Sequence, residues 1–136
     1  MPKITLVALT ITILALVQFF FFLQLVGMAR QRYNVKAPAV TGHDVFERYF
    51  RVQMNTLEQL ILFLPALWIT AIYAFVAYYW IALIGACYLV GRFIYQRSYV
   101  ADPSKRSLGF GLSALPVLAL LLIDIVGVIM LWVRSP

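Results

Sequence analysis

Long runs without a charged residue divide this chain. Residues 4–29 contain no Asp, Glu, Lys or Arg, and this run of 26 residues is flanked by Lys3 and Arg30. About 20 apolar residues suffice for an α-helix to cross a bilayer, whereas the apolar region of a cleaved signal peptide is shorter. The run therefore predicts a membrane-spanning helix rather than a signal peptide.

A second charge-free run covers residues 59–91, which is 33 residues. A single helix of that length would be about 50 Å long, but the hydrocarbon core of a bilayer is only about 30 Å thick. The run must therefore belong to two spans. Aromatic residues of the kind that favour the membrane–water interface lie in its middle, namely Trp68, Tyr73, Tyr78, Tyr79 and Trp80. We place the turn between the two spans near residues 74–77.

The last apolar run, residues 108–133, contains one acidic residue, Asp124. The runs together predict a single all-α domain of residues 1–136, an integral membrane bundle of four transmembrane helices. The four spans are expected over residues 4–29, 47–73, 78–100 and 104–133. Asp102 and Pro103 suit the N-cap and first position of the fourth helix, and residues 38–42 are expected to form an irregular loop.

Composition supports a membrane protein. Hydrophobic residues make up 64% of the chain and charged residues 12%, which is outside the range of ordinary soluble domains and of disordered chains. The net charge of +6 would suggest a nucleic-acid partner in a soluble protein. Here the basic residues are separated by apolar runs, so we expect membrane lipid as a partner and no nucleic acid.

No metal site or internal disulfide is expected. Cys87 is the only cysteine, and no Cys or His cluster has the spacing of metal ligands.

The distribution of Lys and Arg predicts the orientation of the spans. Four spans place both termini on one side of the membrane and loops one and three on the other. Two basic residues, Lys3 and Arg134, lie on the side of the termini. The other nine lie in or beside loops one and three, namely Arg30, Arg32, Lys36, Arg48, Arg51, Arg92, Arg97, Lys105 and Arg106. Because cytoplasmic loops are enriched in Lys and Arg, loops one and three should be cytoplasmic.

A polar stripe on the second helix is not explained by anchoring in the membrane. At about 100° per residue, Glu47, Arg51, Asn55 and Glu58 fall near 0°, 40°, 80° and 20° around the helix, whereas Gln53 falls near 240°. Ionisable groups at membrane depth are costly and tend to line functional sites. The structural alternative is an intramembrane Arg51–Glu58 ion pair with Glu47 at the interface.

A second stripe is expected on the third helix. Tyr88, Arg92, Tyr95 and Tyr99 are spaced by 4, 3 and 4 residues, which places them on one helix face. The structural alternative is an aromatic belt with the Arg92 side chain extending to the interface. Both stripes lie in the cytoplasmic half of the bundle, where Arg106 begins the fourth helix. They predict a cationic, hydrogen-bonding cleft open to both cytosol and lipid.

The same residues carry a family resemblance. The run FERYFRVQMNTLE, from Phe46 to Glu58, resembles the signature E-R-x-x-R-x-x-x-N-x-x-E of the MAPEG superfamily, the membrane-associated proteins in eicosanoid and glutathione metabolism. The similarity continues through YLVGR at residues 88–92 to Tyr95, Tyr99 and Arg106, and Arg30 is also in register. Several family members have a tyrosine where this chain has Gln59.

The resemblance implies a homotrimer of four-helix bundles that binds glutathione between neighbouring subunits. One subunit would contribute five glutathione-binding residues, namely Arg51, Asn55, Glu58, Tyr95 and Tyr99. Its neighbour would contribute Arg30 and Gln53, while Arg48 and Arg92 are further candidates. Arg106 matches the arginine assigned to activation of the thiol.

The resemblance also implies a function. It is that of a membrane-bound glutathione transferase, which conjugates glutathione to a lipophilic electrophile through an arginine-stabilised thiolate. Peroxidase activity toward lipid hydroperoxides is a further expectation.

Two other functions remain as alternatives. One is a non-catalytic member of the same fold that binds a lipid or a partner protein. The presence of Arg106 together with Arg51, Asn55 and Glu58 argues against it. The other is a small four-span proton-coupled exporter that uses Glu58, which would have no obvious use for the neighbouring arginines and tyrosines.

The remaining polar residues give weaker expectations. His43 lies in a polar loop without an evident partner. Asp124 lies in the outer half of the fourth span, at a depth similar to that of Thr5, Thr10, Thr12 and Thr70, and a protonated structural role is favoured over a proton relay. Short tails and the lack of a retention signal favour a bacterial inner membrane over the endoplasmic reticulum.

Overall fold

The computed structural model describes residues 1–135 as four long helices and one short 3-10 turn. The elements are α1 (Lys3–Arg32), α2 (Asp44–Ile72), α3 (Tyr78–Ala101), η1 (Pro103–Arg106) and α4 (Ser107–Arg134), and the described residues contain no strand. Four helical segments are long and apolar enough to cross a membrane. The chain is therefore a multi-pass membrane protein.

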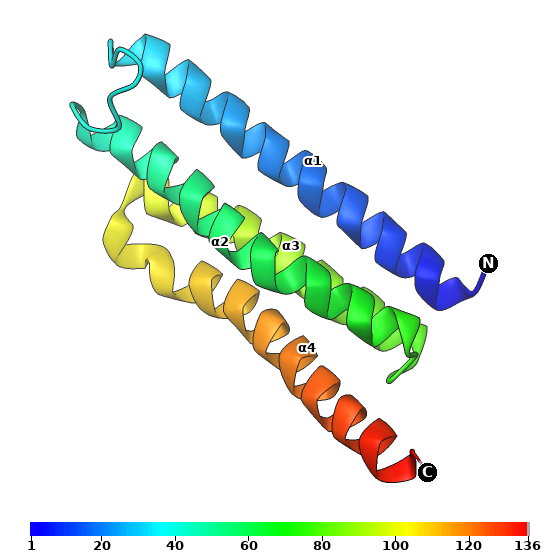
Figure 1. Cartoon of the computed structure of the whole chain (residues 1–136). Helices are drawn as coiled ribbons and strands as arrows, with labels where there is room; N and C mark the ends of the chain where they lie inside the picture. Colours follow the sequence, from blue (N-terminus) through cyan, green and yellow to red (C-terminus); the bar gives the residue numbers. More distant parts are fainter. Residues whose placement is uncertain (136) are drawn as a thin grey trace.

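The helices alternate in direction (Figure 1). Residues 33–43 and the connection from α3 to η1 lie at one end of the bundle, which we call the loop end. Both termini and residues 73–77 lie at the other, which we call the turn end. The four helices coincide with the four predicted spans to within a few residues, and the connection between α2 and α3 lies near the predicted turn at residues 74–77.

The start of the fourth span differs from the prediction. Asp102 does cap a helical segment, because its carboxylate accepts hydrogen bonds from the Ser104 N–H at 3.0 Å and the Ser104 hydroxyl at 2.8 Å. The hydroxyl of Ser104, followed by its N–H, holds the pKa of Asp102 below its usual range. The capped segment is η1, however, and Arg106 closes this 3-10 turn rather than lying in the first turn of α4. Such turns are frequent at helix N-termini.

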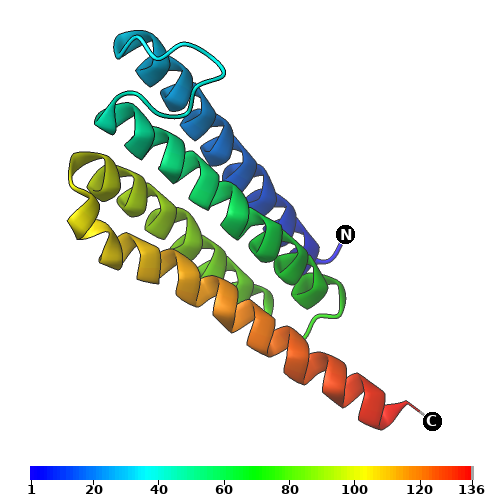
Figure 2. The ribbon, with the colours of Figure 1, turned by 60° about the vertical axis from the view of Figure 1, so that its left-hand side comes forward.

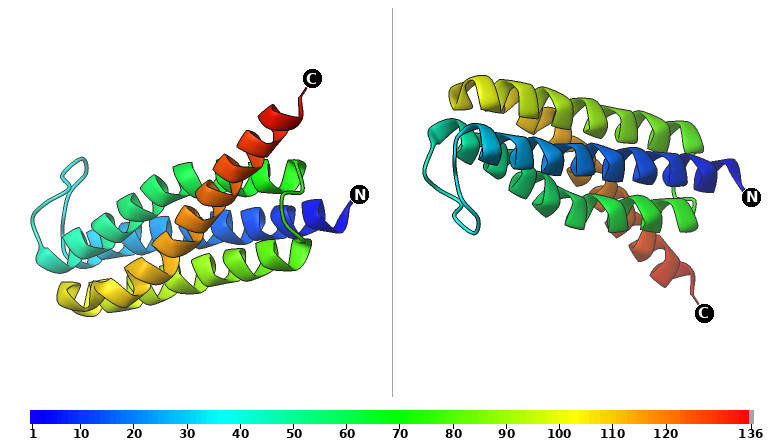
Figure 3. Two further views of the ribbon diagram at one scale, coloured as in Figure 1. Left: turned by 90° about the horizontal axis from the view of Figure 1, so that it is seen from below. Right: turned by 90° about the horizontal axis from the view of Figure 1, so that it is seen from above.

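The first three helices pack along their length, whereas α4 crosses them obliquely (Figures 2 and 3). The C-terminal half of α4 diverges from the bundle toward the turn end. The position of the site therefore depends on how the N-terminal half of α4 meets α3.

Two glycines allow α4 to approach α3 closely at the loop end. A methyl group on Gly91 would lie 2.6 Å from the backbone carbon of Leu112, and one on Gly109 would overlap the backbone of Tyr95. Small residues at helix crossings bring membrane helices into van der Waals contact. Gly109 thus fixes the first turn of α4 directly against α3 at Tyr95.

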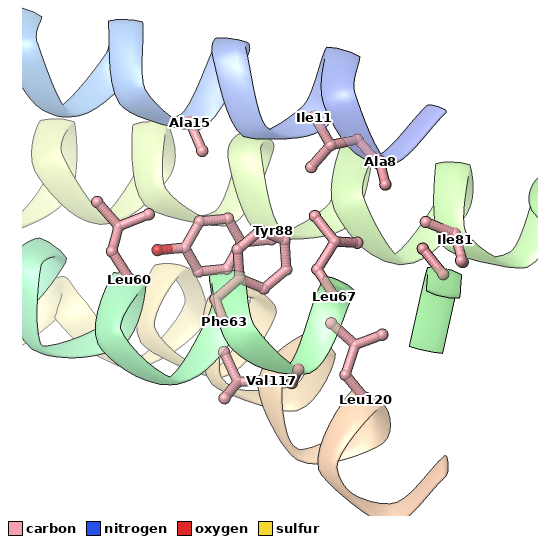
Figure 4. Packing of buried hydrophobic residues seen from close by; sticks show 12 residues of the cluster. Ala8, Ile11, Ala15, Leu60, Phe63, Leu67, Ile81, Tyr88, Val117 and Leu120 are labelled. Atoms are coloured by element: carbon pink, nitrogen blue, oxygen red, sulfur yellow. The ribbon is translucent and has the colours of Figure 1, made fainter. Parts of the chain in front are cut away.

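The hydrophobic core joins all four helices (Figure 4). Its centre is a stacked pair from α2 and α3, because the rings of Phe63 and Tyr88 lie 3.8 Å apart at an angle of 6°. Tyr88 is fully buried among apolar side chains. The expectation that Tyr88 belongs to the polar cleft is therefore wrong, since the stripe on α3 enters the core one turn beyond Arg92.

The outer surface is apolar. On α1, for example, Ile13, Val17 and Phe20 are each about 60% exposed. A soluble protein would bury such residues, whereas here they face the positions that lipid chains occupy.

Candidate functional site

The two polar stripes meet at one hydrogen bond between α2 and α3. The Asn55 amide Nδ2 donates to the hydroxyl oxygen of Tyr95 at 2.6 Å. The ring of Tyr95 is buried and lies 5.3 Å from that of Tyr99. The expected convergence of the stripes is thus present at Asn55, Tyr95 and Tyr99.

Two charged members of the α2 stripe, Arg51 and Glu58, point away from the bundle. Arg51 and Glu58 are exposed, whereas Val52 and Thr56 on the opposite side of the helix are buried. The ion pair between Lys105 and Asp102 is the one salt bridge within residues 1–135. The alternative of an intramembrane Arg51–Glu58 pair is therefore wrong.

Two other residues of the signature hold the loop end together. Glu47 accepts a hydrogen bond from the backbone N–H of Gly42 at 3.0 Å, which ties the first loop to α2. Arg48 donates to the carbonyl oxygens of Val100 and Ala101 at 3.2 and 3.3 Å. These carbonyls end α3 and have no partner within the helix, so Arg48 caps it.

His43 also has a local partner that the sequence did not reveal. Its Nδ1 accepts a hydrogen bond from the N–H of Val45 at 3.2 Å, so that it caps α2. Its ring stacks on Tyr33 at 4.0 Å. These contacts give His43 a structural role at the start of the helix that carries the signature.

Arg30 and Gln53 occupy different surroundings from the stripe within one subunit. The Arg30 guanidinium donates to the carbonyl oxygens of Val35 and Ala39 and lies 4.8 Å from the ring centroid of Phe46. Gln53 is 8% exposed, so it lies on a different face of α2 from Arg51 and Glu58. The expectation that Gln53 points away from the stripe is confirmed.

A groove of about 390 Å³ opens beside the stripe at the loop end. That volume is within the range of about 300–1,000 Å³ typical of small-molecule sites. Its walls come from the first loop, α2 and α3, and its lining residues are Val40, Thr41, Asp44, Glu47, Arg48, Phe50, Arg51 and Tyr99. The groove thus presents two cations, two acids and a phenol to a polar ligand.

Arg106 lies beside this region with a free head group. It is exposed and closes η1, three residues before the Gly109 contact with Tyr95. Its side chain makes no hydrogen bond or ion pair within residues 1–135. Its charge is therefore available to a ligand.

A sequence profile of the MAPEG family matches residues 7–126. This range contains every candidate site residue and most of all four helices. The chain belongs to the MAPEG family.

Similar proteins share most of their length with this MAPEG chain. The uncharacterized protein sll1147 of Synechocystis sp. is 46% identical over 105 residues, which cover 77% of this chain and 75% of that protein. Microsomal glutathione S-transferase 2 of Homo sapiens is 40% identical over 111 residues, covering 82% and 74% respectively. Leukotriene C4 synthase of Rattus norvegicus is 36% identical over 107 residues, covering 78% and 69%.

Arg92 of the MAPEG chain is buried behind the polar cluster. It is 0% exposed, and its guanidinium lies 4.3 Å from the ring centroid of Tyr95. The alternative in which its side chain extends to the interface is therefore wrong. Its partners are Thr56 on α2 and Ser113 on α4. The sequence does not single them out, because small polar residues are common within apolar helices.

A second polar contact lies toward the turn end, away from the signature. The hydroxyl of Thr70 donates to a carboxyl oxygen of Asp124 at 2.6 Å, and both side chains are buried. Of the four threonines predicted at a similar depth, Thr70 is thus the one that bonds Asp124. Residues 1–135 contain no group of three or more His, Cys, Asp or Glu residues that could hold a metal ion.

Proposed function

We propose that this MAPEG protein is a membrane-bound glutathione transferase that conjugates glutathione to a lipophilic electrophile. The same thiolate would serve peroxidase chemistry on lipid hydroperoxides. The observation that carries the proposal is the Asn55–Tyr95 hydrogen bond, because it joins the α2 signature to the α3 tyrosines beside η1. The similarity to proteins named microsomal glutathione S-transferase 2 and leukotriene C4 synthase supports it.

The residue types suit the groups of glutathione. The tripeptide has two carboxylates, an ammonium group, two amides and a thiol. Arginines such as Arg51 can donate two hydrogen bonds to a carboxylate. Glu58 can accept from the ammonium group, and Asn55 can both donate and accept.

The neighbouring subunit completes the proposed site. Glu58 lies 14 residues after Asp44, which is about 21 Å along a helix of about 43 Å. An exposed carboxylate halfway across a membrane is costly unless a partner covers it. We propose that a homotrimer covers this face and that Arg30 and Gln53 reach glutathione from the neighbour.

Arg106 is the proposed source of thiol activation. A free thiol with a pKa of about 8.5 is only about 3% thiolate at pH 7. Lowering that pKa by two units requires roughly 2.7 kcal/mol of preferential stabilisation of the thiolate. A guanidinium in a partly dehydrated site can supply this, and because arginine stays charged, the thiol proton leaves to water.

The lipophilic substrate would approach through the membrane. The apolar faces of the helices are exposed along the bundle, so a lipid-dissolved electrophile can reach the loop end without crossing water. The thiolate then attacks the electrophilic carbon. As the sulfur–carbon bond forms, the electron pair departs with a leaving group or, at an epoxide or a conjugated double bond, moves onto the substrate, which then takes a proton from water.

The test is the ionisation of bound glutathione on full-length, detergent-purified protein. Ultraviolet difference absorbance follows the thiolate while pH is varied with glutathione at saturation. Wild type should show thiolate below pH 8, and Arg106→Ala should lower the thiolate fraction at neutral pH by up to about 100-fold. The loss in turnover should be smaller, because a more basic thiolate is also a better nucleophile.

Each result has a distinct meaning. If wild type binds glutathione but forms no thiolate below pH 8, the chain is a non-catalytic binding member of the family. If glutathione does not bind, the exporter alternative gains. If Arg106→Ala keeps the thiolate, transferase activity stands but another cation activates the thiol.

A further inference from the structure

Arg92 is a buried cation at the point where three helices meet. Its Nη2 donates to the Thr56 hydroxyl at 2.6 Å and to the Val52 carbonyl oxygen at 3.4 Å, both on α2. Its Nη1 donates to the Ser113 hydroxyl on α4 at 3.5 Å. The Nε has no partner, and within residues 1–135 no carboxylate lies within 4 Å of the guanidinium.

A charged side chain is not needed merely to link these three helices. Burying a charge is costly unless it is paired, and neutral polar side chains could join the same three helices. A buried charge also acts over longer distances than an exposed one, because water and salt screen it less. Arg92 therefore supplies positive potential inside the bundle, whereas the charge of exposed Arg106 is hydrated.

The residue that receives this potential is Tyr95. The Arg92 guanidinium lies 4.3 Å from the Tyr95 ring centroid, and the Tyr95 oxygen accepts from Asn55 at 2.6 Å. The hydroxyl hydrogen of Tyr95 has no acceptor within residues 1–135. Both the cation and the Asn55 donor withdraw electron density from the phenol, which makes its free O–H a stronger donor.

We propose that the Tyr95 hydroxyl donates a hydrogen bond to the glutathione sulfur and that Arg92 is a positioning residue that strengthens this bond. This inference rests on the proposed function and adds a second source of thiolate stabilisation. Arg92 would touch no substrate atom. Its guanidinium would pack on the face of the Tyr95 ring and polarise the hydroxyl from the buried side. Arg106 would act on the sulfur from the solvent side.

The test follows the pKa of glutathione bound to full-length, detergent-purified variants by ultraviolet difference absorbance. Arg92→Met should raise that pKa by about one unit, which is about tenfold less thiolate at neutral pH. Glutathione affinity from calorimetry should change by a smaller factor. Arg92→Lys keeps the charge and should restore most of the shift.

A double-mutant comparison shows whether Arg92 acts through Tyr95. Tyr95→Phe should raise the pKa of bound glutathione, and adding Arg92→Met to it should produce little further rise. A full additional shift in the Tyr95→Phe background would overturn the proposal. So would an unchanged pKa in Arg92→Met.

Thr56→Val is the control for a merely structural role. It removes the shortest hydrogen bond of Arg92 but leaves the charge in place, so the pKa of bound glutathione should hardly move. A shift as large as that of Arg92→Met would overturn the proposal. If Arg92→Met does not fold, as judged by circular dichroism and size exclusion, Arg92→Gln replaces it, with the same expected shift.

Two results distinguish a wrong role for Arg92 from a wrong proposed function. Absence of thiolate in wild type removes both. A wild-type thiolate that Arg92→Met leaves unchanged removes the role of Arg92 alone.

Discussion

Glu58 is an acidic residue about halfway along a membrane helix, on a face that its own subunit leaves exposed. Asn55, one turn earlier, instead turns toward Tyr95. The two side chains point in directions about 60° apart around α2. Asn55 is therefore held within the subunit, whereas Glu58 needs a partner from outside it. In the proposed transferase that partner is the glutathione ammonium group.

Glu58→Gln should weaken glutathione binding while the oligomer remains intact. The change removes the charge that faces the ammonium group, and a hydrogen bond to a charged group is worth roughly 1.5–3 kcal/mol. This corresponds to about a 10- to 150-fold loss in affinity. Calorimetry on detergent-purified protein measures the loss, and size exclusion reports the oligomer.

Asp124→Asn is the matched control for Glu58→Gln. It also replaces an acid within a span by its amide. Asp124 bonds Thr70 toward the turn end, away from the signature, and an amide oxygen can accept the same hydrogen bond. Its affinity for glutathione should equal that of wild type. Equal affinity in Glu58→Gln would remove Glu58 from the site, and dissociation of the oligomer would show a structural role instead.

At the scale of elements, the crossing of α3 and α4 determines where Arg106 lies. Gly91 and Gly109 remove side chains at the points of closest approach, so that the backbones of the two helices meet near Tyr95. Asp102 caps η1 and fixes the chain just before Arg106. The position of the proposed activating charge is thus set by two small residues and one cap, none of which would touch substrate.

Gly109→Ala should reduce turnover more than glutathione affinity. The added methyl group would overlap the backbone of Tyr95, so α4 must move away and carry Arg106 with it. Overpacking of this kind typically costs about 1–3 kcal/mol of stability, and a displacement of about 1 Å at a catalytic group can cost about 100-fold in rate. Turnover and thermal unfolding in detergent measure the two effects.

Gly111→Ala is the control, because a methyl group there would meet nothing within 4 Å. It makes the same substitution two residues further along α4. Its turnover and unfolding temperature should stay close to those of wild type. Equal effects of the two substitutions would mean that glycine flexibility in α4, rather than close approach to α3, controls the site.

At the scale of the whole molecule, the charges are divided between the two ends of the bundle. The loops and helix ends at the loop end carry nine of the eleven Lys and Arg residues, and the turn end carries Lys3 and Arg134. The proposed glutathione site lies at the basic end. The positive-inside rule predicts that this end faces the cytosol, which is where a water-soluble tripeptide would enter.

A cysteine introduced at Thr41, in a Cys87→Ser background, should react with a membrane-impermeant thiol reagent only from the cytosolic face. Thr41 is exposed and lies in the first loop. A cysteine at exposed Ala77, at the turn end, should react only from the opposite face. Labelling of intact cells compared with inverted vesicles gives the orientation, and the reverse pattern would contradict it.

The sequence alone determined the number and order of the helices and, to within a few residues, where they lie. Charge-free runs long enough for a bilayer leave few ways to satisfy the backbone, since only helices can span the membrane with every hydrogen bond made internally. Aromatic residues marked the turn at 74–77 and Asp102 marked the cap of the fourth span, because both signals depend on local chemistry. The helical period also indicated that Asn55 and Tyr95 lie on polar stripes in the same half of the bundle.

Only the tertiary structure decided what each polar side chain of these helices contacts. Tyr88 enters the core, Arg48 caps α3 and Arg92 is buried against Thr56, although helical spacing alone placed Tyr88 and Arg92 in the cleft. Helical periodicity gives the direction of a side chain around its own helix. It does not give the distance to the next helix, such as the close approach of α3 and α4 at Gly109, and that distance decides which side chains are buried.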